Sequence, residues 1–204
     1  MLESRSALTP QDPGAGRTKP RALSIGEVGG FALLQVAAFA DTRMELERAV
    51  RSALGIDLPQ RSDTPSRAGG YRVFKVGPEV FWIVGPDDTR TVPSSWVAAV
   101  REAVPAAIGS VTPLSHGRTR LLIEGASARE VLSKGIALDL HPDVLQPGAC
   151  ALTGLQGTPV LLHRTGPDAY ELYVLRTFAA WIWEWLTDAA LPLGYEVVDS
   201  TAAR

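Results

Sequence analysis

The sequence at residues 71–84 reads YRVFKVGPEVFWIV, and this stretch decides the fold class. Two runs of apolar, β-branched and aromatic residues, 71–76 and 80–84, stand on either side of Gly77-Pro78-Glu79. Strand-forming runs that flank a short group of turn-forming residues are the pattern of a β-hairpin. Because a hairpin joins antiparallel strands, the stretch favours a sheet with antiparallel pairs over an all-parallel sheet.

The hairpin pattern occurs a second time along the chain. The residues Gly77-Pro78-Glu79-Val80-Phe81 are echoed by Gly166-Pro167-Asp168-Ala169-Tyr170. Both hairpins lead into a segment with helical spacing that contains tryptophan, Trp96 in the first case and Trp181 in the second. We interpret this likeness as a pseudo-duplication of a strand–helix–hairpin–helix unit.

The other expected elements follow the same order in both halves. In the first half they are a strand near 31–39 and helices near 42–54 and 93–104. In the second half they begin with a strand at 118–124 and a helix from about Ser127 to Gly135. Strands near 149–156, 159–164 and 169–175 and a helix near 177–190 then follow. The predicted fold class is α+β, with mixed or antiparallel sheets that carry helices on one face.

The domain organisation follows from composition and from the repeat. Residues 1–22 are rich in Pro, Gly, Arg and Ser without apolar periodicity, which predicts a flexible tail. Residues 23–204 are expected to form a single domain made of two similar halves, at about 23–107 and 108–198. The chain has 204 residues and is 46% hydrophobic, enough for a full core.

Charge and cysteine content narrow the function classes. The net charge of −2, from 20 basic and 22 acidic residues, provides no field for a nucleic acid partner. The single cysteine, Cys150, has no partner for an internal disulfide. No apolar run approaches the ~20 residues that span a bilayer, and the N-terminus lacks a secretory pattern. We therefore expect a cytoplasmic protein with no membrane association.

Motifs of catalysis or cofactor binding are scarce. The three histidines, His116, His141 and His163, are not spaced as metal ligands. No Gly-x-Ser-x-Gly, Gly-x-Gly-x-x-Gly or Walker-type loop occurs, and Ser127 stands where a helix N-cap belongs. The sequence predicts no catalytic residue, no metal and no cofactor on this chain.

Four residues are candidates for a subunit interface. Asp139 and His141 lie two apart, which in extended geometry places both on one face. This pair suits general acid–base chemistry, or it pins the turn before Pro142 through a hydrogen bond. Arg176, which precedes the last helix, is a candidate interface ion-pair donor rather than a solvated charge.

The last helix has an aromatic residue off its predicted buried face. Helical spacing predicts a core stripe of Phe178, Trp181, Ile182, Trp185, Leu186 and Ala189. Trp183 falls on the side that should face water. Since tryptophan is enriched at subunit contacts, Trp183 either folds against its neighbours or meets a partner.

Several motifs in the second half resemble the gamma subunit of heterotetrameric sarcosine oxidase. They lie, in the same order, at residues 114–125 (LSHGRTRLLIEG), 131–135 (VLSKG), 138–142 (LDLHP), 148–153 (GACALT), 170–178 (YELYVLRTF) and 183–190 (WEWLTDAA). The resemblance covers about residues 110–197 and, more weakly, the first half. It implies a fold like the folate-binding domain of aminomethyltransferases.

The resemblance also implies a function that the motif search alone does not supply. It implies a non-catalytic subunit, acting in assembly and stability, with alpha, beta and delta subunits as partners. FAD, FMN, NAD, tetrahydrofolate and zinc are implied for those partners. The implied reaction is oxidative demethylation of sarcosine to glycine, with hydrogen peroxide and either formaldehyde or 5,10-methylenetetrahydrofolate as products.

Two alternatives stay open at this point. One is the equivalent subunit of a related N-methyl amino acid dehydrogenase, because residues that contact the substrate would lie on another subunit. The other is a free-standing, folate-binding protein similar to an aminomethyltransferase.

Overall fold

The hairpin at residues 71–84 forms as the sequence predicts. In the computed structural model, which describes residues 6–8, 23–86 and 95–198, β4 (Tyr71–Lys75) pairs antiparallel with β5 (Val80–Val84). They belong to sheet B, whose strand order is β3-β4-β5-β2-β6 and whose other strands are β2 (Leu33–Ala38), β3 (Ser66–Ala68) and β6 (Gly109–Pro113). In the described part of the chain, the strands of sheet B pair antiparallel with their neighbours.

The second sheet, sheet A, has the strand order β11-β1-β7-β10-β9-β8. Its strands are β1 (Ser24–Val28), β7 (Arg118–Glu124), β8 (Cys150–Leu155), β9 (Thr158–Arg164), β10 (Ala169–Leu175) and β11 (Glu196–Val197). Its pairings are antiparallel except for β1 with β11, which run parallel. The α+β fold class with mixed and antiparallel sheets is confirmed.

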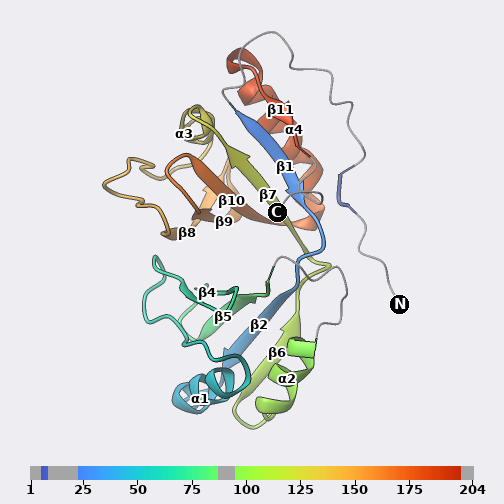
Figure 1. The fold of residues 1–204 in the computed structure, drawn as a ribbon, viewed down its shortest axis with the longest axis vertical. Helices are drawn as coiled ribbons and strands as arrows, with labels where there is room; N and C mark the ends of the chain where they lie inside the picture. The colour runs from blue at the N-terminus through green and yellow to red at the C-terminus, as the bar shows by residue number, and fades with distance from the viewer. Residues whose placement is uncertain (1–5, 9–22, 87–94, 199–204) are drawn as a thin grey trace. The chain divides into compact units, whose positions relative to one another are not determined.

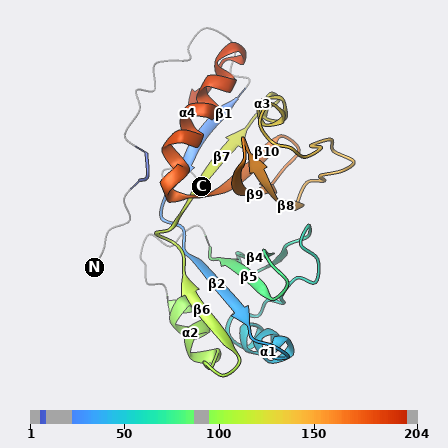
Figure 2. The same ribbon diagram turned by 180° about the vertical axis from the view of Figure 1, so that it is seen from behind.

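Helices accompany each sheet. Sheet B carries α1 (Arg43–Leu54) and α2 (Ser95–Ala103). Sheet A carries α3 (Ala128–Ser133) and α4 (Ala179–Ala190). Short 3-10 turns, η1 (Arg176–Phe178) and η2 (Leu191–Leu193), lie at the two ends of α4. Figure 2 shows the helices from behind. The helix predicted near 42–54 is confirmed as α1, and Gly55 ends it in the left-handed conformation, with φ of 67°.

The chain forms two compact units that do not coincide with the two halves of the sequence. Unit 2 is Gly30–Ser115, and unit 1 is Met1–Gly29 with His116–Arg204. In tandem order the first half begins with β1 and β2, and the second begins with β6 and β7. However, β1 pairs with β7, and β6 pairs with β2. The two halves therefore exchange their first strands.

The two echoed turns have the same hydrogen bonds. In unit 2, the N–H groups of Val76 and Gly77 donate to the carbonyl of Val80, and in unit 1 those of Thr165 and Gly166 donate to the carbonyl of Ala169. Each turn is also held by an arginine. Arg43 donates to the carbonyl of Pro78 and lies over the Phe81 ring, and Arg164 donates to that of Pro167 and lies over the Tyr170 ring.

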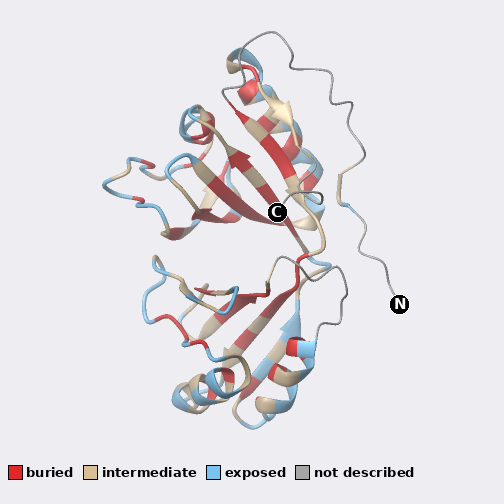
Figure 3. Cartoon of the chain, in the orientation of Figure 1, coloured by how far each residue is buried: buried red, intermediate tan, exposed pale blue. Residues whose placement is uncertain are grey.

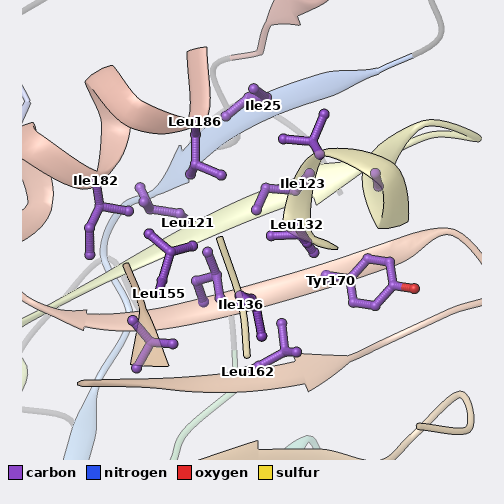
Figure 4. Close-up of a cluster of buried hydrophobic side chains, with 14 of the residues drawn as sticks. Ile25, Leu121, Ile123, Leu132, Ile136, Leu155, Leu162, Tyr170, Ile182 and Leu186 are labelled. Carbon is purple, nitrogen blue, oxygen red and sulfur yellow. The ribbon is translucent and has the colours of Figure 1, made fainter. Parts of the chain in front are cut away.

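Each unit has its own hydrophobic core, and the buried residues follow the strands in Figure 3. In unit 1 the core lies between sheet A and its helices. It includes Ile25, Leu121 and Ile123 from the strands and Ile182 and Leu186 from α4 (Figure 4). These positions alternate along β7 and recur with helical spacing along α4, which is why one face of each element is buried.

The predicted buried face of α4 was right for Ile182 and Leu186, which are buried, and wrong for Phe178 and Trp181. The residues that are buried along α4 are Ala179, Ile182, Trp183, Leu186 and Ala190. Trp183 is only 3% exposed, whereas Phe178 and Trp181 are both 42% exposed. Apolar residues occupy both candidate stripes of this segment, so helical spacing alone does not decide which of them is buried.

A close helix contact in unit 1 provides a first test. A Cβ added at Gly135 would lie 2.4 Å from the ring of Trp185, so Gly135→Ala is expected to lower the free energy of unfolding by about 1–3 kcal/mol through overpacking. A Cβ at Gly154 would meet nothing closer than 3.7 Å, which makes Gly154→Ala the matched control. Urea denaturation measures both. Equal midpoints for the two variants would contradict the contact.

Candidate functional site

Sheet A carries a buried polar cluster that matches no sequence motif of catalysis or cofactor binding. Glu171 on β10 lies opposite His163 on β9, and Tyr173 on β10 lies opposite Arg120 on β7. Since residues two apart on a strand share a face, the four side chains lie on the same face of the sheet. Their exposures are 6%, 0%, 1% and 1%, respectively. We call these four residues the polar cluster.

Glu171 is the centre of the polar cluster. The Tyr173 hydroxyl donates to Glu171 Oε2 at 2.8 Å, and His163 Nδ1 lies 3.3 Å from the same oxygen. The other carboxylate oxygen, Oε1, lies 3.8 Å from Nη1 of Arg120. One carboxylate therefore links three neighbouring strands through a hydroxyl, an imidazole and a guanidinium.

The chemistry of the polar cluster is that of a buried, charge-assisted network. A carboxylate beside Nδ1 favours a proton on that nitrogen, which fixes the orientation of the His163 ring. Cys150 lies opposite His163 on β8, so a thiol, an imidazole and a carboxylate stand in a row across three strands. This order is known from nucleophilic catalysis, but Cys150 is 1% exposed. The burial of all three groups favours a structural role.

Charged residues inside apolar strands were the signal that sequence reasoning missed. Glu171 interrupts the run AYELYVL at 169–175, and Arg120 interrupts RTRLLIE at 118–124. A charged residue in such a strand is either on a solvated face or paired in the interior. The pairing across strands depends on the sheet order, which the sequence does not state.

The predicted pair Asp139 and His141 lies in the segment between α3 and β8. An Asp139 carboxylate oxygen accepts a hydrogen bond from the backbone N–H of His141 at 2.8 Å. The His141 ring, whose side chain is 57% exposed, lies 3.4 Å from the Asp143 carboxylate. Of the two readings of the pair, the geometry is that of a turn pinned before Pro142. Contact with a partner subunit stays a prediction.

The segment that carries Asp139 and His141 is anchored by Arg164, which is 4% exposed. Arg164 donates through Nη1 to the Leu145 carbonyl at 2.7 Å, through Nε to the Gly166 carbonyl at 3.1 Å, and through Nη2 to the Pro167 carbonyl. Its guanidinium carbon lies 5.6 Å from the centre of the Tyr170 ring. Burial raises the pKa of Tyr170 above its ordinary value.

The other two interface candidates have contacts within unit 1. Arg176 donates from Nη2 to the carbonyl of Ser6 at 2.9 Å, and Trp183 belongs to the hydrophobic core. The prediction that Trp183 faces water was therefore wrong. The four candidates do not form one site: Asp139 and His141 share one turn, and Arg176 contacts the N-terminal segment instead.

The described part of the chain contains no group of three or more His, Cys, Asp or Glu side chains that could hold a metal ion.

Ser127 precedes α3 at the N-cap position as predicted, although its side chain makes no capping hydrogen bond. Among the helices at 43–54, 95–103, 128–133 and 179–190, none is long and apolar enough to cross a membrane.

Comparison with known proteins gives one consistent result. Residues 38–191 match the family described as "Sarcosine oxidase, gamma subunit family". The sarcosine oxidase subunit gamma of an Arthrobacter species is 30% identical over 82% of this chain and 84% of its own length. The sarcosine oxidase subunit gamma of Corynebacterium sp. (strain P-1) is 29% identical over 87% of this chain and 89% of its own length.

Solved structures agree with these relatives. A chain of the heterotetrameric sarcosine oxidase from Corynebacterium sp. U-96, in complex with pyrrole 2-carboxylate, matches with a TM-score of 0.78 and 26% identity, over 94% of this chain and 92% of that chain. The aminomethyltransferase T of Bartonella henselae matches with a TM-score of 0.61 and 16% identity, over 89% of this chain and 49% of that protein. The second likeness concerns the fold alone.

Proposed function

Because the chain belongs to the sarcosine oxidase gamma subunit family, we propose that it is the non-catalytic gamma subunit of a heterotetrameric sarcosine oxidase and acts in assembly and stability. The match to a chain of the solved heterotetramer, which covers 94% of this chain, is the observation that supports this proposal most strongly. A subunit that matches over almost its whole length is expected to fill the same place in its complex.

The chemistry of the complex is assigned to the partner subunits. In this proposal, alpha, beta and delta subunits hold FAD, FMN, NAD, tetrahydrofolate and zinc. They demethylate sarcosine oxidatively to glycine, with hydrogen peroxide and formaldehyde or 5,10-methylenetetrahydrofolate as the other products. The burial of the polar cluster supports this division of labour, since its Glu171 and His163 are in contact with each other and have almost no exposed surface.

The turn at residues 139–144 is the part of unit 1 that we propose for contact with a partner. Leu140 within the turn and Leu145 directly after it are buried, at 2% and 4% exposure, while Val144 is 59% exposed. Buried anchors and the Arg164 hydrogen bond to Leu145 hold the turn in a fixed conformation. A preorganised turn loses little conformational freedom when it binds.

Co-purification from the native host tests the proposed function. A tagged chain is expected to recover a complex with flavin absorbance and three further subunits, identified by mass spectrometry. Deletion of the gene for this chain is expected to reduce the yield of assembled oxidase at least tenfold. A colourless chain recovered alone, or an intact and fully active oxidase without it, would contradict the proposal.

The same experiment tests the proposed contact. Val144→Arg is expected to lower the recovery of partners at least tenfold while the denaturation midpoint of the chain stays unchanged. Met44→Arg is the control, because Met44 is 70% exposed on α1 and lies outside the proposed contact. Equal recovery with both variants would remove the turn from the interface.

A folate-binding protein is a second candidate, favoured by the likeness in fold to the aminomethyltransferase. Titration of the purified chain with tetrahydrofolate separates the two functions. Saturable binding to the chain alone supports this candidate, and binding only in the presence of partner subunits supports the oxidase subunit.

A further inference from the structure

A short piece of the N-terminal region lies against unit 1. Ser6, Ala7 and Leu8 are separated by at least fifteen residues from β1, the first strand that they contact. Ala7 and Leu8 are partly buried and pack against the hydrophobic core of unit 1. The sequence predicts a flexible tail here, because residues 1–22 have no apolar periodicity. The position of residues 6–8 must therefore be explained by the side chains of unit 1 that they contact.

Two charged side chains supply that cause. The Glu27 carboxylate accepts from the backbone N–H of Ala7 at 3.0 Å, through Oε1, and from the hydroxyl of Ser6, through Oε2. Arg176 donates from Nη2 to the backbone carbonyl of Ser6 at 2.9 Å. An acid at the end of β1 and a base at the start of η1 thus bind consecutive main-chain groups of one peptide unit.

These contacts recognise main chain more than side chain. The N–H and the C=O groups are present in any residue except proline, which lacks the N–H. The one side chain with a polar role is Ser6, whose hydroxyl also accepts from the N–H of Leu8 at 2.9 Å. Small or apolar side chains then follow at positions 7 and 8, where they meet the core.

We propose that Glu27 and Arg176 form a clasp for a short peptide segment, and that residues 6–8 close it as a strap over the unit 1 core. Hydrogen bonds to charged groups favour the closed strap. The loss of backbone freedom in residues 6–8 opposes closure by a similar amount. The strap is consequently poised between a closed and an open state, unlike the strands beneath it.

Hydrogen exchange of the full chain, followed residue by residue by NMR, tests the clasp. The amide of Ala7 is expected to exchange at least tenfold more slowly than in an unstructured peptide of the same sequence. It should also exchange at least a hundredfold faster than core amides such as that of Leu121. Glu27→Ala, which removes the acceptor of the Ala7 N–H, and Arg176→Met are each expected to remove most of the protection at Ala7. Glu184→Gln, on the exposed side of α4, is the matched control.

A second variant separates loss of the strap from loss of the fold. Ala7→Pro removes the backbone N–H that donates a hydrogen bond to Glu27. It changes no residue of the sheets or helices. The amide of Leu8 is then expected to lose its protection while β7 and β10 keep theirs. Exchange of Ala7 at the rate of an unstructured peptide in the unaltered chain, or unchanged protection in Glu27→Ala, would overturn the proposal. The result does not depend on the proposed function, since the chain is measured alone.

Discussion

Glu171→Gln is expected to lower the free energy of unfolding by about 3–5 kcal/mol, the cost of breaking a buried ion pair by removing one partner. The substitution keeps the size of the side chain but removes its charge. It leaves Arg120 without the carboxylate that lies 3.8 Å away, and it weakens the hydrogen bonds with Tyr173 and His163. Urea denaturation followed by tryptophan fluorescence measures the change.

Two companions make this result specific to the polar cluster. Tyr173→Phe removes a single hydroxyl and should cost about 1 kcal/mol. Because the hydroxyl donates to Glu171, the double variant should cost less than the sum of the two single variants. Glu184→Gln, an exposed position on α4, should stay within about 0.5 kcal/mol. Strict additivity would mean that Tyr173 and Glu171 do not interact.

Arg164→Met is expected to cost about 4 kcal/mol, because three carbonyls lose a charged donor at once. Each hydrogen bond to a charged group contributes about 1.5–3 kcal/mol, and contributions within one network are less than additive. Arg164→Lys should recover little of the loss, since an ammonium group cannot reach carbonyls in the directions of the guanidinium fork. Denaturation by urea gives the stability.

A local readout separates the anchoring role from general destabilisation. Arg164→Met should increase the exchange rates of the amides near Leu145 and Gly148. The exchange rates of the β7 amides should increase by a smaller factor. Arg48→Met is the control, because the Arg48 side chain is 71% exposed on α1. A uniform increase in exchange across unit 1 would contradict the anchoring role.

The sequence predicts most elements of this fold because their signals are local. The hairpin at 71–84 and the helix that ends at Gly55 are marked by turn-forming residues and by a glycine in the left-handed conformation. The strands at 24–28 and 109–113 were not predicted as separate elements. They are short, contain glycine or proline, and are specified by their partners β7 and β2 rather than by their own composition.

Residues of the candidate sites were harder to predict because their contacts are non-local. Glu171, His163 and Arg120 come together only through the order of β7, β10 and β9. The turn at Asp139 was predictable, since its hydrogen bond joins residues two apart. Trp183 shows the limit of periodicity: α4 is apolar on more than one side, and Trp183 is buried whereas Trp181 is 42% exposed.

The exchange of first strands also sets an order of events on the ribosome. Ser24 pairs with Glu124, so β1 leaves the exit tunnel long before its partner β7 exists. At about 5–20 residues per second, synthesis of the intervening hundred residues takes on the order of 5–20 s. Sheet B, which needs only residues up to β6, is complete first. Strand β1 must therefore stay without this partner until β7 has been synthesised and has left the exit tunnel.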